Sequence, residues 1–159
     1  MVLINDTPYD LTPIAGYPFE LDNFQKYAIN AINKKNNVLI TAHTGSGKTL
    51  PAEYAMEKSI FERKRVIYTA PIKSLSNQKY QEFTARYPNI TFGLITGDIK
   101  CNPTAQCLIM TTEILRNALF EHKMENKVKN SFEMDFENEL ACIVFDEVHY
   151  INDTERGRV

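Results

Sequence analysis

The stretch that decides the fold spans residues 38–49 and reads Val38-Leu39-Ile40-Thr41-Ala42-His43-Thr44-Gly45-Ser46-Gly47-Lys48-Thr49. It begins as a short apolar, β-branched run, which is typical of a buried strand. A glycine-containing turn follows, and glycine permits backbone conformations in which successive N–H groups turn inward around phosphate oxygens. The residues after the turn predict a helix over 48–62, which would add the partial positive charge of its N-terminus. The stretch therefore predicts a nucleotide site between a strand and a helix.

Within this loop, the lysine and the threonine have the most specific predicted roles. Lys48 can reach the β- and γ-phosphates as a mobile charge, and the Thr49 hydroxyl can ligate Mg²⁺. The strict GxxxxGK[ST] pattern fails at its first position, where Ala42 replaces glycine, but a methyl group is small enough not to block the loop. A glycine-rich turn with an exposed lysine is the alternative, which the strand and helix context disfavours. The predicted phosphate-binding residues are Ala42, His43, Thr44, Gly45, Ser46, Gly47, Lys48 and Thr49.

The rest of the chain alternates apolar runs with segments of helical spacing. Further strands are expected at 66–69, 91–95, 107–110 and 141–145, and further helices at 22–34, 74–87 and 113–120. Nearly continuous apolar strands that alternate with helices predict an α/β fold, with a mostly parallel sheet and helices on both faces. Polar clusters follow the carboxyl ends of the strands, where open α/β sheets bind ligands. Residues 121–139 break this rhythm, and we expect a surface excursion there, with room for a short edge strand.

Two acids end the last predicted strand. Ile143-Val144-Phe145 precedes Asp146 and Glu147, and adjacent strand residues point to opposite sides, so the two carboxylates can take different roles. We expect Asp146 to hold Mg²⁺, and Glu147 to orient and deprotonate an attacking water. A strand that ends in Asp-Glu is common, and alone it favours a solvated strand end. The phosphate loop upstream reverses that preference.

Composition sets limits on the class of protein. Hydrophobic residues make up 43% of the chain and charged residues 24%, as in ordinary globular proteins, and no apolar run approaches the roughly 20 residues of a membrane helix. Cys101, Cys107 and Cys142 have no metal-ligand spacing, so free or buried thiols are expected. A net charge of −2 gives no broad attraction for nucleic acid, so any such binding must come from a local groove.

Several motifs resemble one known family in the same order. The run Asp146-Glu147-Val148-His149 resembles the DEVH box of the superkiller-type RNA helicases, which belong to helicase superfamily two. The phosphate loop resembles the family's first motif, including its alanine. The family's other motifs are matched by Phe19-Glu20-Leu21-Asp22-Asn23-Phe24-Gln25, Ala70-Pro71-Ile72-Lys73-Ser74-Leu75-Ser76-Asn77-Gln78, Gly93-Leu94-Ile95-Thr96-Gly97-Asp98 and Ile109-Met110-Thr111-Thr112-Glu113-Ile114-Leu115-Arg116.

This resemblance implies roles for further residues. Gln25 would read the adenine edge, Phe19 would pack against the base, and His149 would couple the nucleotide state to the nucleic-acid groove. A carboxamide can both donate to and accept from adenine, and a ring offers a stacking face. The groove would hold one strand by its sugars and phosphates. Its implied residues are Pro71, Lys73, Ser74, Thr96, Gly97, Thr111, Thr112 and Arg116.

The resemblance also implies an organisation and a function. Residues 1–18 carry Pro8, Pro13, Gly16 and Pro18 without a sustained period, so these residues themselves predict an extended lead-in. By the resemblance, residues 19–159 would be an incomplete first RecA-like P-loop domain, truncated before the rest of that domain and the second RecA-like domain. The implied function is an ATP-dependent helicase that uses Mg²⁺ and moves along single-stranded RNA, inside the cell, in the cytoplasm or the nucleus. Two alternatives stay open. One is a DNA helicase or translocase of the same superfamily, and the other is a non-catalytic, nucleotide-gated module that binds nucleic acid.

Overall fold

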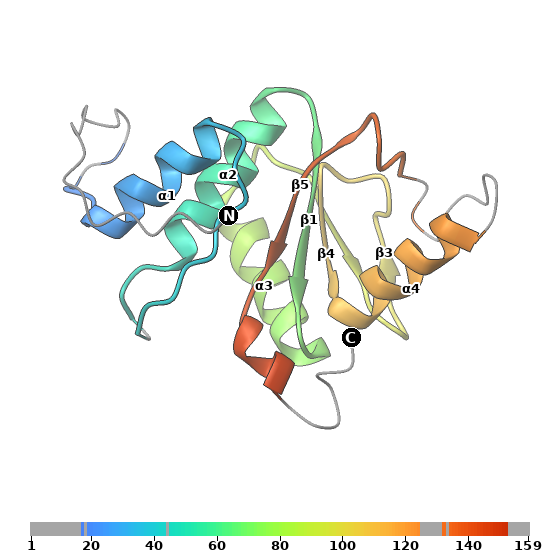
Figure 1. The fold of residues 1–159 in the computed structure, drawn as a ribbon. Coiled ribbons are helices and arrows are strands. Elements are labelled where there is room, and N and C mark those ends of the chain that lie inside the picture. Colours follow the sequence, from blue (N-terminus) through green and yellow to red (C-terminus); the bar gives the residue numbers. More distant parts are fainter. Residues whose placement is uncertain (1–16, 18, 44, 125–131, 133, 153–159) are drawn as a thin grey trace. The chain divides into compact units, whose positions relative to one another are not determined.

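The computed structural model describes residues 17, 19–43, 45–124, 132 and 134–152 (Figure 1). The chain forms two compact units, residues 1–55 and 56–159. Most of the lead-in expected over residues 1–18 lies outside the described residues. In the described parts of the chain, no helix is both long and apolar enough to cross a membrane.

The first unit contains α1 (Asn23–Asn33) and the first turns of α2 (Thr49–Phe61). Helix α1 begins after Asp22, whose backbone N–H donates to Gln25 Oε1 over 2.9 Å. A Gln side chain at the third helical position that accepts from this N–H is one half of a capping box. The buried residues of α1 are Gln25, Ala28 and Ile29, which share one helical face.

The strand predicted over 38–41 is wrong. The structure assigns no strand to residues 36–43, and Leu39 is 74% exposed. A strand forms only when its backbone groups pair with a neighbouring strand, and none of the described strands pairs with this segment. A short apolar run alone does not supply that partner.

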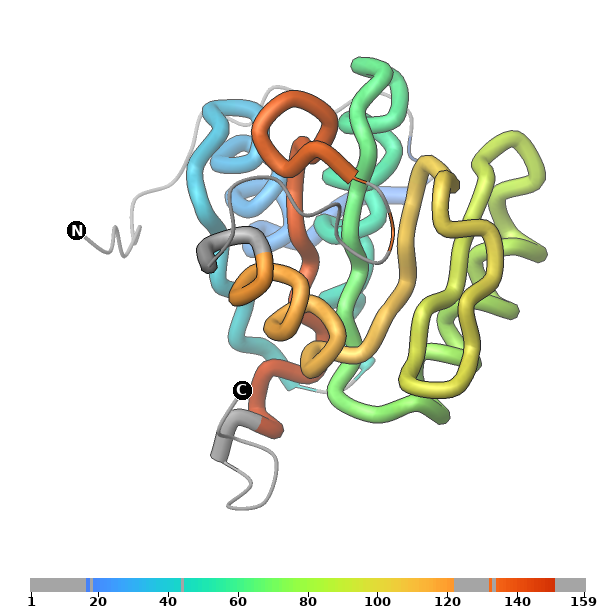
Figure 2. Tube along the Cα trace, turned by 90° about the vertical axis from the view of Figure 1, so that its right-hand side faces the viewer, coloured from blue at the N-terminus to red at the C-terminus, as the bar shows by residue number. Residues whose placement is uncertain are grey.

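The second unit contains a five-stranded sheet, whose order is β3-β2-β4-β1-β5. Its strands are β1 (Arg65–Ala70), β2 (Phe92–Ile95), β3 (Lys100–Cys101), β4 (Cys107–Thr111) and β5 (Leu140–Phe145). All pairs are parallel except β2 with β3. Figure 2 shows β5, β1 and β4 side by side, in red, green and gold. The mostly parallel sheet is confirmed, and the antiparallel edge strand β3 was not predicted.

Helices cover both faces of this sheet, as the sequence predicts. Helix α3 (Lys73–Arg86) packs Phe83 edge-on against Tyr68, with ring centroids 5.2 Å apart. Helix α4 (Thr112–Met124) places Leu115 in the cluster that contains Ile67, the neighbour of Tyr68 along β1. Adjacent strand residues face opposite sides, so the two helices lie on opposite faces, as Figure 1 shows.

The prediction of a surface excursion over residues 121–139 is wrong for the part around Phe132 and Met134. Residues 125–131 and 133 lie outside the described residues. Phe132 is fully buried and Met134 is 5% exposed, and both belong to the core cluster with Ile67 and Leu108. Phe136 packs against the same cluster. Alternating apolar residues among acids therefore close one side of the core, and the described part of the segment contains no edge strand.

We predict that Phe132→Ala lowers the free energy of unfolding by about 3–5 kcal/mol, because it removes a fully buried ring and leaves a cavity. Urea denaturation measures this loss. The matched control is Phe120→Ala on α4, where the ring is 59% exposed and the expected change is below about 0.5 kcal/mol. Equal losses in the two variants would contradict the core position of Phe132.

Candidate functional site

The phosphate loop turns through two glycines in left-handed backbone conformations. Gly45 has φ +83° and Gly47 has φ +78°, a region that costs little only without a Cβ. The Ser46 hydroxyl donates to the His43 carbonyl over 2.8 Å, which ties the turn together. The helix begins directly afterwards at Thr49. Two left-handed glycines directly before a helix are compatible with a phosphate-binding turn, and Thr44 lies outside the described residues.

Lys48 folds back over its own loop. Its ammonium donates to the Ala42 carbonyl over 2.7 Å, and its side chain is half-buried. An ammonium has three donors, so this single bond leaves capacity for phosphate oxygens. The small side chain of Ala42 is half-buried at the same point. Thr49 offers a hard oxygen at the helix start, the ligand type that Mg²⁺ prefers.

Gln25 connects α1 to the phosphate loop. Its Nε2 donates to the Gly47 carbonyl over 3.1 Å, its Oε1 accepts from Asp22, and its side chain is 5% exposed. A carboxamide keeps one N–H and one lone pair after these two bonds, so reading of adenine remains chemically open. Phe19 is 55% exposed, with its ring 5.8 Å from that of Tyr17, so part of its ring is accessible to a base.

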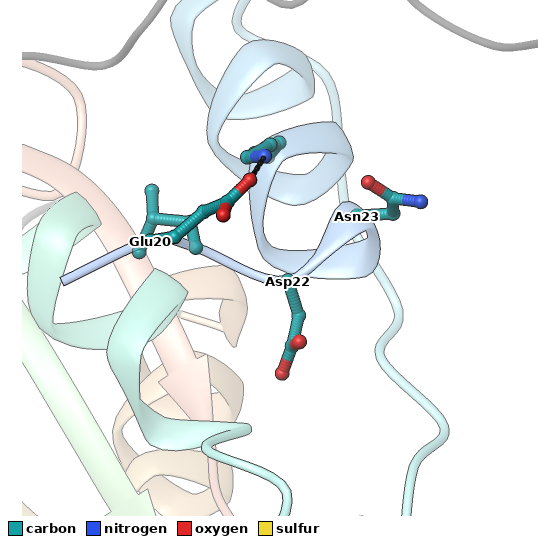
Figure 3. A pocket seen from close by; sticks show the side chains of 5 residues that line it. Glu20, Asp22 and Asn23 are labelled. Atoms are coloured by element: carbon teal, nitrogen blue, oxygen red, sulfur yellow. Dashed lines mark hydrogen bonds and ion pairs between the residues drawn. The ribbon is translucent and has the colours of Figure 1, made fainter.

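An open pocket beside the start of α1 does not fit a phosphate. Its lining includes Glu20 and Asp22, and its one cation, Lys26, is paired with Glu20 over 3.2 Å (Figure 3). Two carboxylates against one neutralised ammonium repel an anion. We therefore assign no ligand to this pocket.

The carboxylate of Asp146 is held by two hydrogen bonds. The Tyr68 hydroxyl donates to Oδ2 over 2.7 Å, and the Glu147 backbone N–H donates to Oδ1 over 2.9 Å. The Asp146 N–H itself donates to the Thr69 carbonyl over 2.9 Å and extends the β1–β5 ladder. About two lone-pair positions remain on the carboxylate, and hard oxygens of this kind suit Mg²⁺.

Tyr68 is a functional candidate that sequence reasoning missed. It lies in the middle of β1 and is 1% exposed, so its sequence context indicates only a core aromatic. The available signal was the hydroxyl itself, because a buried tyrosine almost always needs a hydrogen-bond partner. The register that pairs Tyr68 with Val144, two residues before Asp146, identifies that partner only in three dimensions.

Glu147 holds a strained position. Its φ is +51°, which is costly for a residue with a Cβ. Its Oε2 lies 3.2 Å from His149 Nδ1, and the two side chains are 43% and 68% exposed. His149 lies in the 3-10 helix η1 (Val148–Asn152). The structure thus brings the predicted base and the predicted coupling histidine into contact.

The groove residues follow the carboxyl ends of β1, β2 and β4. The Lys73 ammonium lies 2.9 Å from Asp98 Oδ1 and just above Gly97, and the Thr112 hydroxyl donates to the Ala70 carbonyl over 3.3 Å. Thr96 and Thr111 are 6% and 7% exposed, Arg116 is half-buried, Pro71 is half-buried and Ser74 is exposed. The exposed groups of this set are therefore Lys73, Ser74 and Gly97.

The three cysteines are free thiols of different exposure. Cys101 is exposed, Cys107 is buried and Cys142 is half-buried, with the Ser59 hydroxyl 3.7 Å from its sulfur. Burial raises the pKa of both Cys107 and Cys142, so these two stay protonated and unreactive at neutral pH.

We predict that Gly47→Ala destabilises the chain more than Gly45→Ala. Both variants incur about 1–3 kcal/mol of left-handed strain, but a Cβ at Gly47 would lie 2.6 Å from Gln25 Nε2, whereas none of the surrounding atoms lies within 4 Å at Gly45. Displacing Gln25 breaks its bond to the loop and adds about 1 kcal/mol. Denaturant unfolding of both variants measures the difference. Equal losses would show that Gln25 does not support the loop.

Comparison with known proteins identifies the family of this chain. The model of the DEAD/DEAH box helicase family matches residues 22–159. The chain is 46% identical over 149 residues to the ATP-dependent RNA helicase mtr4 of Schizosaccharomyces pombe, 47% over 143 residues to the exosome RNA helicase MTR4 of Homo sapiens, and 44% over 147 residues to the antiviral helicase SKI2 of Saccharomyces cerevisiae.

These alignments cover 94%, 90% and 92% of this chain, but the chain spans only 11–12% of the length of these relatives. They match the superkiller-type helicases that the motifs indicate, and the resemblance is confirmed. The chain belongs to the DEAD/DEAH box helicase family.

Proposed function

We propose that this chain is the ATP-binding part of an RNA helicase, which couples hydrolysis of Mg·ATP to movement along single-stranded RNA and to duplex unwinding. The observation that carries the proposal is the phosphate loop, with left-handed Gly45 and Gly47 before Lys48, in a chain of the helicase family. Relatives that are named RNA helicases, at 46–47% identity, favour RNA over DNA. An intracellular location, in the cytoplasm or the nucleus, stays a prediction.

The residues of the chain divide the work of hydrolysis. Loop N–H groups and Lys48 bind the phosphates, and Lys48 exchanges the Ala42 carbonyl for a phosphate oxygen. Thr49 and Asp146 would hold Mg²⁺, which when bound neutralises phosphate charge. Glu147 orients water and accepts its proton. His149 contacts Glu147, so movement of one side chain would change the position of the other.

The groove and a second domain would complete the motor. Lys73, Ser74 and Gly97 offer a cation, a hydroxyl and a backbone group at the exposed edge, which suits sequence-independent grip on a phosphodiester backbone. A second RecA-like domain would add arginines, which are worth roughly 10³–10⁵ in rate in related P-loop enzymes. We therefore expect weak hydrolysis by this chain alone.

We predict that Glu147→Gln lowers the rate of RNA-stimulated ATP hydrolysis by about 10²-fold or more, because the amide cannot accept the proton of water. Binding of a fluorescent ATP analogue should persist, since the phosphate loop is unchanged. Steady-state hydrolysis is measured with matched single-stranded RNA and DNA. Equal stimulation by DNA would favour the DNA helicase, and nucleotide binding without any hydrolysis, in the full-length protein, would favour the non-catalytic module.

We also predict that Tyr68→Phe raises the Mg²⁺ concentration needed for tight nucleotide binding by about tenfold. This is the lower end of the loss in metal affinity that follows when a metal ligand loses a supporting hydrogen bond. The variant removes the hydroxyl that holds Asp146 Oδ2 and keeps the ring against Phe83. Mg²⁺ titration of nucleotide binding measures the shift. Tyr80→Phe is the matched control, since its hydroxyl lies beside Cys101. An unchanged Mg²⁺ requirement in Tyr68→Phe would exclude a positioning role.

A further inference from the structure

An acid occupies the predicted nucleic-acid groove. Asp98 Oδ1 lies 2.9 Å from the Lys73 ammonium, and the two side chains are 65% and 57% exposed. Lys73 is the first residue of α3, and Asp98 follows β2. Such a carboxylate lies where a polyanion would bind, and it repels each phosphate that approaches. Its presence therefore needs an explanation.

The carboxylate is the fixed member of this pair. Thr96, which is 6% exposed, donates its hydroxyl to Asp98 Oδ1 over 2.9 Å and accepts the Ile99 N–H over 3.2 Å. The bond to Lys73, followed by the bond to Thr96, lowers the pKa of Asp98. Asp98 is therefore charged at neutral pH and tied to the loop backbone, whereas Lys73 reaches it through a flexible chain.

Lys73 can leave this partner at small cost. Exposed ion pairs contribute little, because water solvates both groups almost as well. The Lys73 Nζ atom lies 3.6 Å from where a Cβ on Gly97 would be. The ammonium therefore lies beside the backbone of Gly97, a residue that has no side chain. A phosphodiester that reached this point would meet the same ammonium and the same loop.

We propose that Asp98 competes with RNA phosphate for the Lys73 ammonium and thereby weakens the grip of the groove. This inference rests on the proposed function, since it concerns how the same groove holds single-stranded RNA. A phosphate that takes Lys73 displaces Asp98 and then lies beside a second anion. A phosphate can therefore bind the Lys73 ammonium only by displacing Asp98. The groove then releases each phosphate more readily than it would if Asp98 were absent.

We predict that Asp98→Asn tightens binding of a short fluorescent oligouridylate by about fivefold at low salt. Two charges about 4 Å apart in water repel by an amount of this size, and fivefold corresponds to about 1 kcal/mol. The slope of log affinity against log salt should steepen by about 0.7, as for one further phosphate contact on a single strand. Fluorescence anisotropy across a salt series measures both quantities.

Glu82→Gln is the matched control. It also neutralises one acid that is paired with a lysine, because Glu82 lies 3.2 Å from the half-buried Lys79 within α3. Both variants change the net charge equally, so a general charge effect would tighten binding to the same extent in each. Tightening confined to Asp98→Asn supports the competition.

A double-mutant cycle decides between competition and positioning. If Asp98 competes, Lys73→Gln weakens binding more in the Asp98→Asn background than in the parent chain. If Asp98 merely positions Lys73, Asp98→Asn weakens binding and the second substitution adds less, which overturns the inference. RNA binding that Asp98→Asn leaves unchanged also overturns it and leaves the proposed function intact. Absence of RNA binding in every variant would overturn both.

Discussion

The two parallel ladders of β1 are the constraint on which the rest of the second unit depends. Ala70 pairs with Thr111 of β4, and Thr69 pairs with Phe145 of β5. Because parallel strands in register end at one edge, the residues that follow them leave the sheet together. Tyr68, in the same strand, then reaches the carboxylate of Asp146. One strand thus supplies both the register and the support for the predicted metal ligand.

Much of this architecture could be predicted from the sequence, because its elements have strong local signals. Strands β1, β2, β4 and β5 and the four α-helices of the described residues begin and end within a few residues of the expected positions, since apolar strand runs and helical spacing differ clearly in period. The errors lie where a partner decides the outcome. Residues 38–41 have strand-like side chains but no described ladder, and Phe132 lies in a charged segment but fills the core. Local sequence contains neither fact.

The candidate site shows the same division. Composition and spacing identify Gly45, Gly47 and Lys48, because a phosphate loop is contiguous in sequence. Tyr68 was missed, and Asp98 was noted only as part of a motif, because their contacts with Asp146 and Lys73 join segments far apart in the chain. The roles of Gln25, Phe19 and the groove residues remain predictions. In the second unit, Lys73 contacts Asp98 and Glu147 contacts His149, so a ligand that binds Lys73 or Glu147 would replace an existing contact.

The left-handed backbone at Glu147 has a consequence for how such a protein can be improved. Glycine would adopt φ +51° freely, and asparagine more easily than glutamate. Laboratory evolution under heat alone would therefore favour replacement of this residue and would recover strain of about 1–3 kcal/mol. The same step would discard the carboxylate. For the predicted base, stability and turnover therefore make opposite demands on one residue, so selection for thermostability must also test for activity.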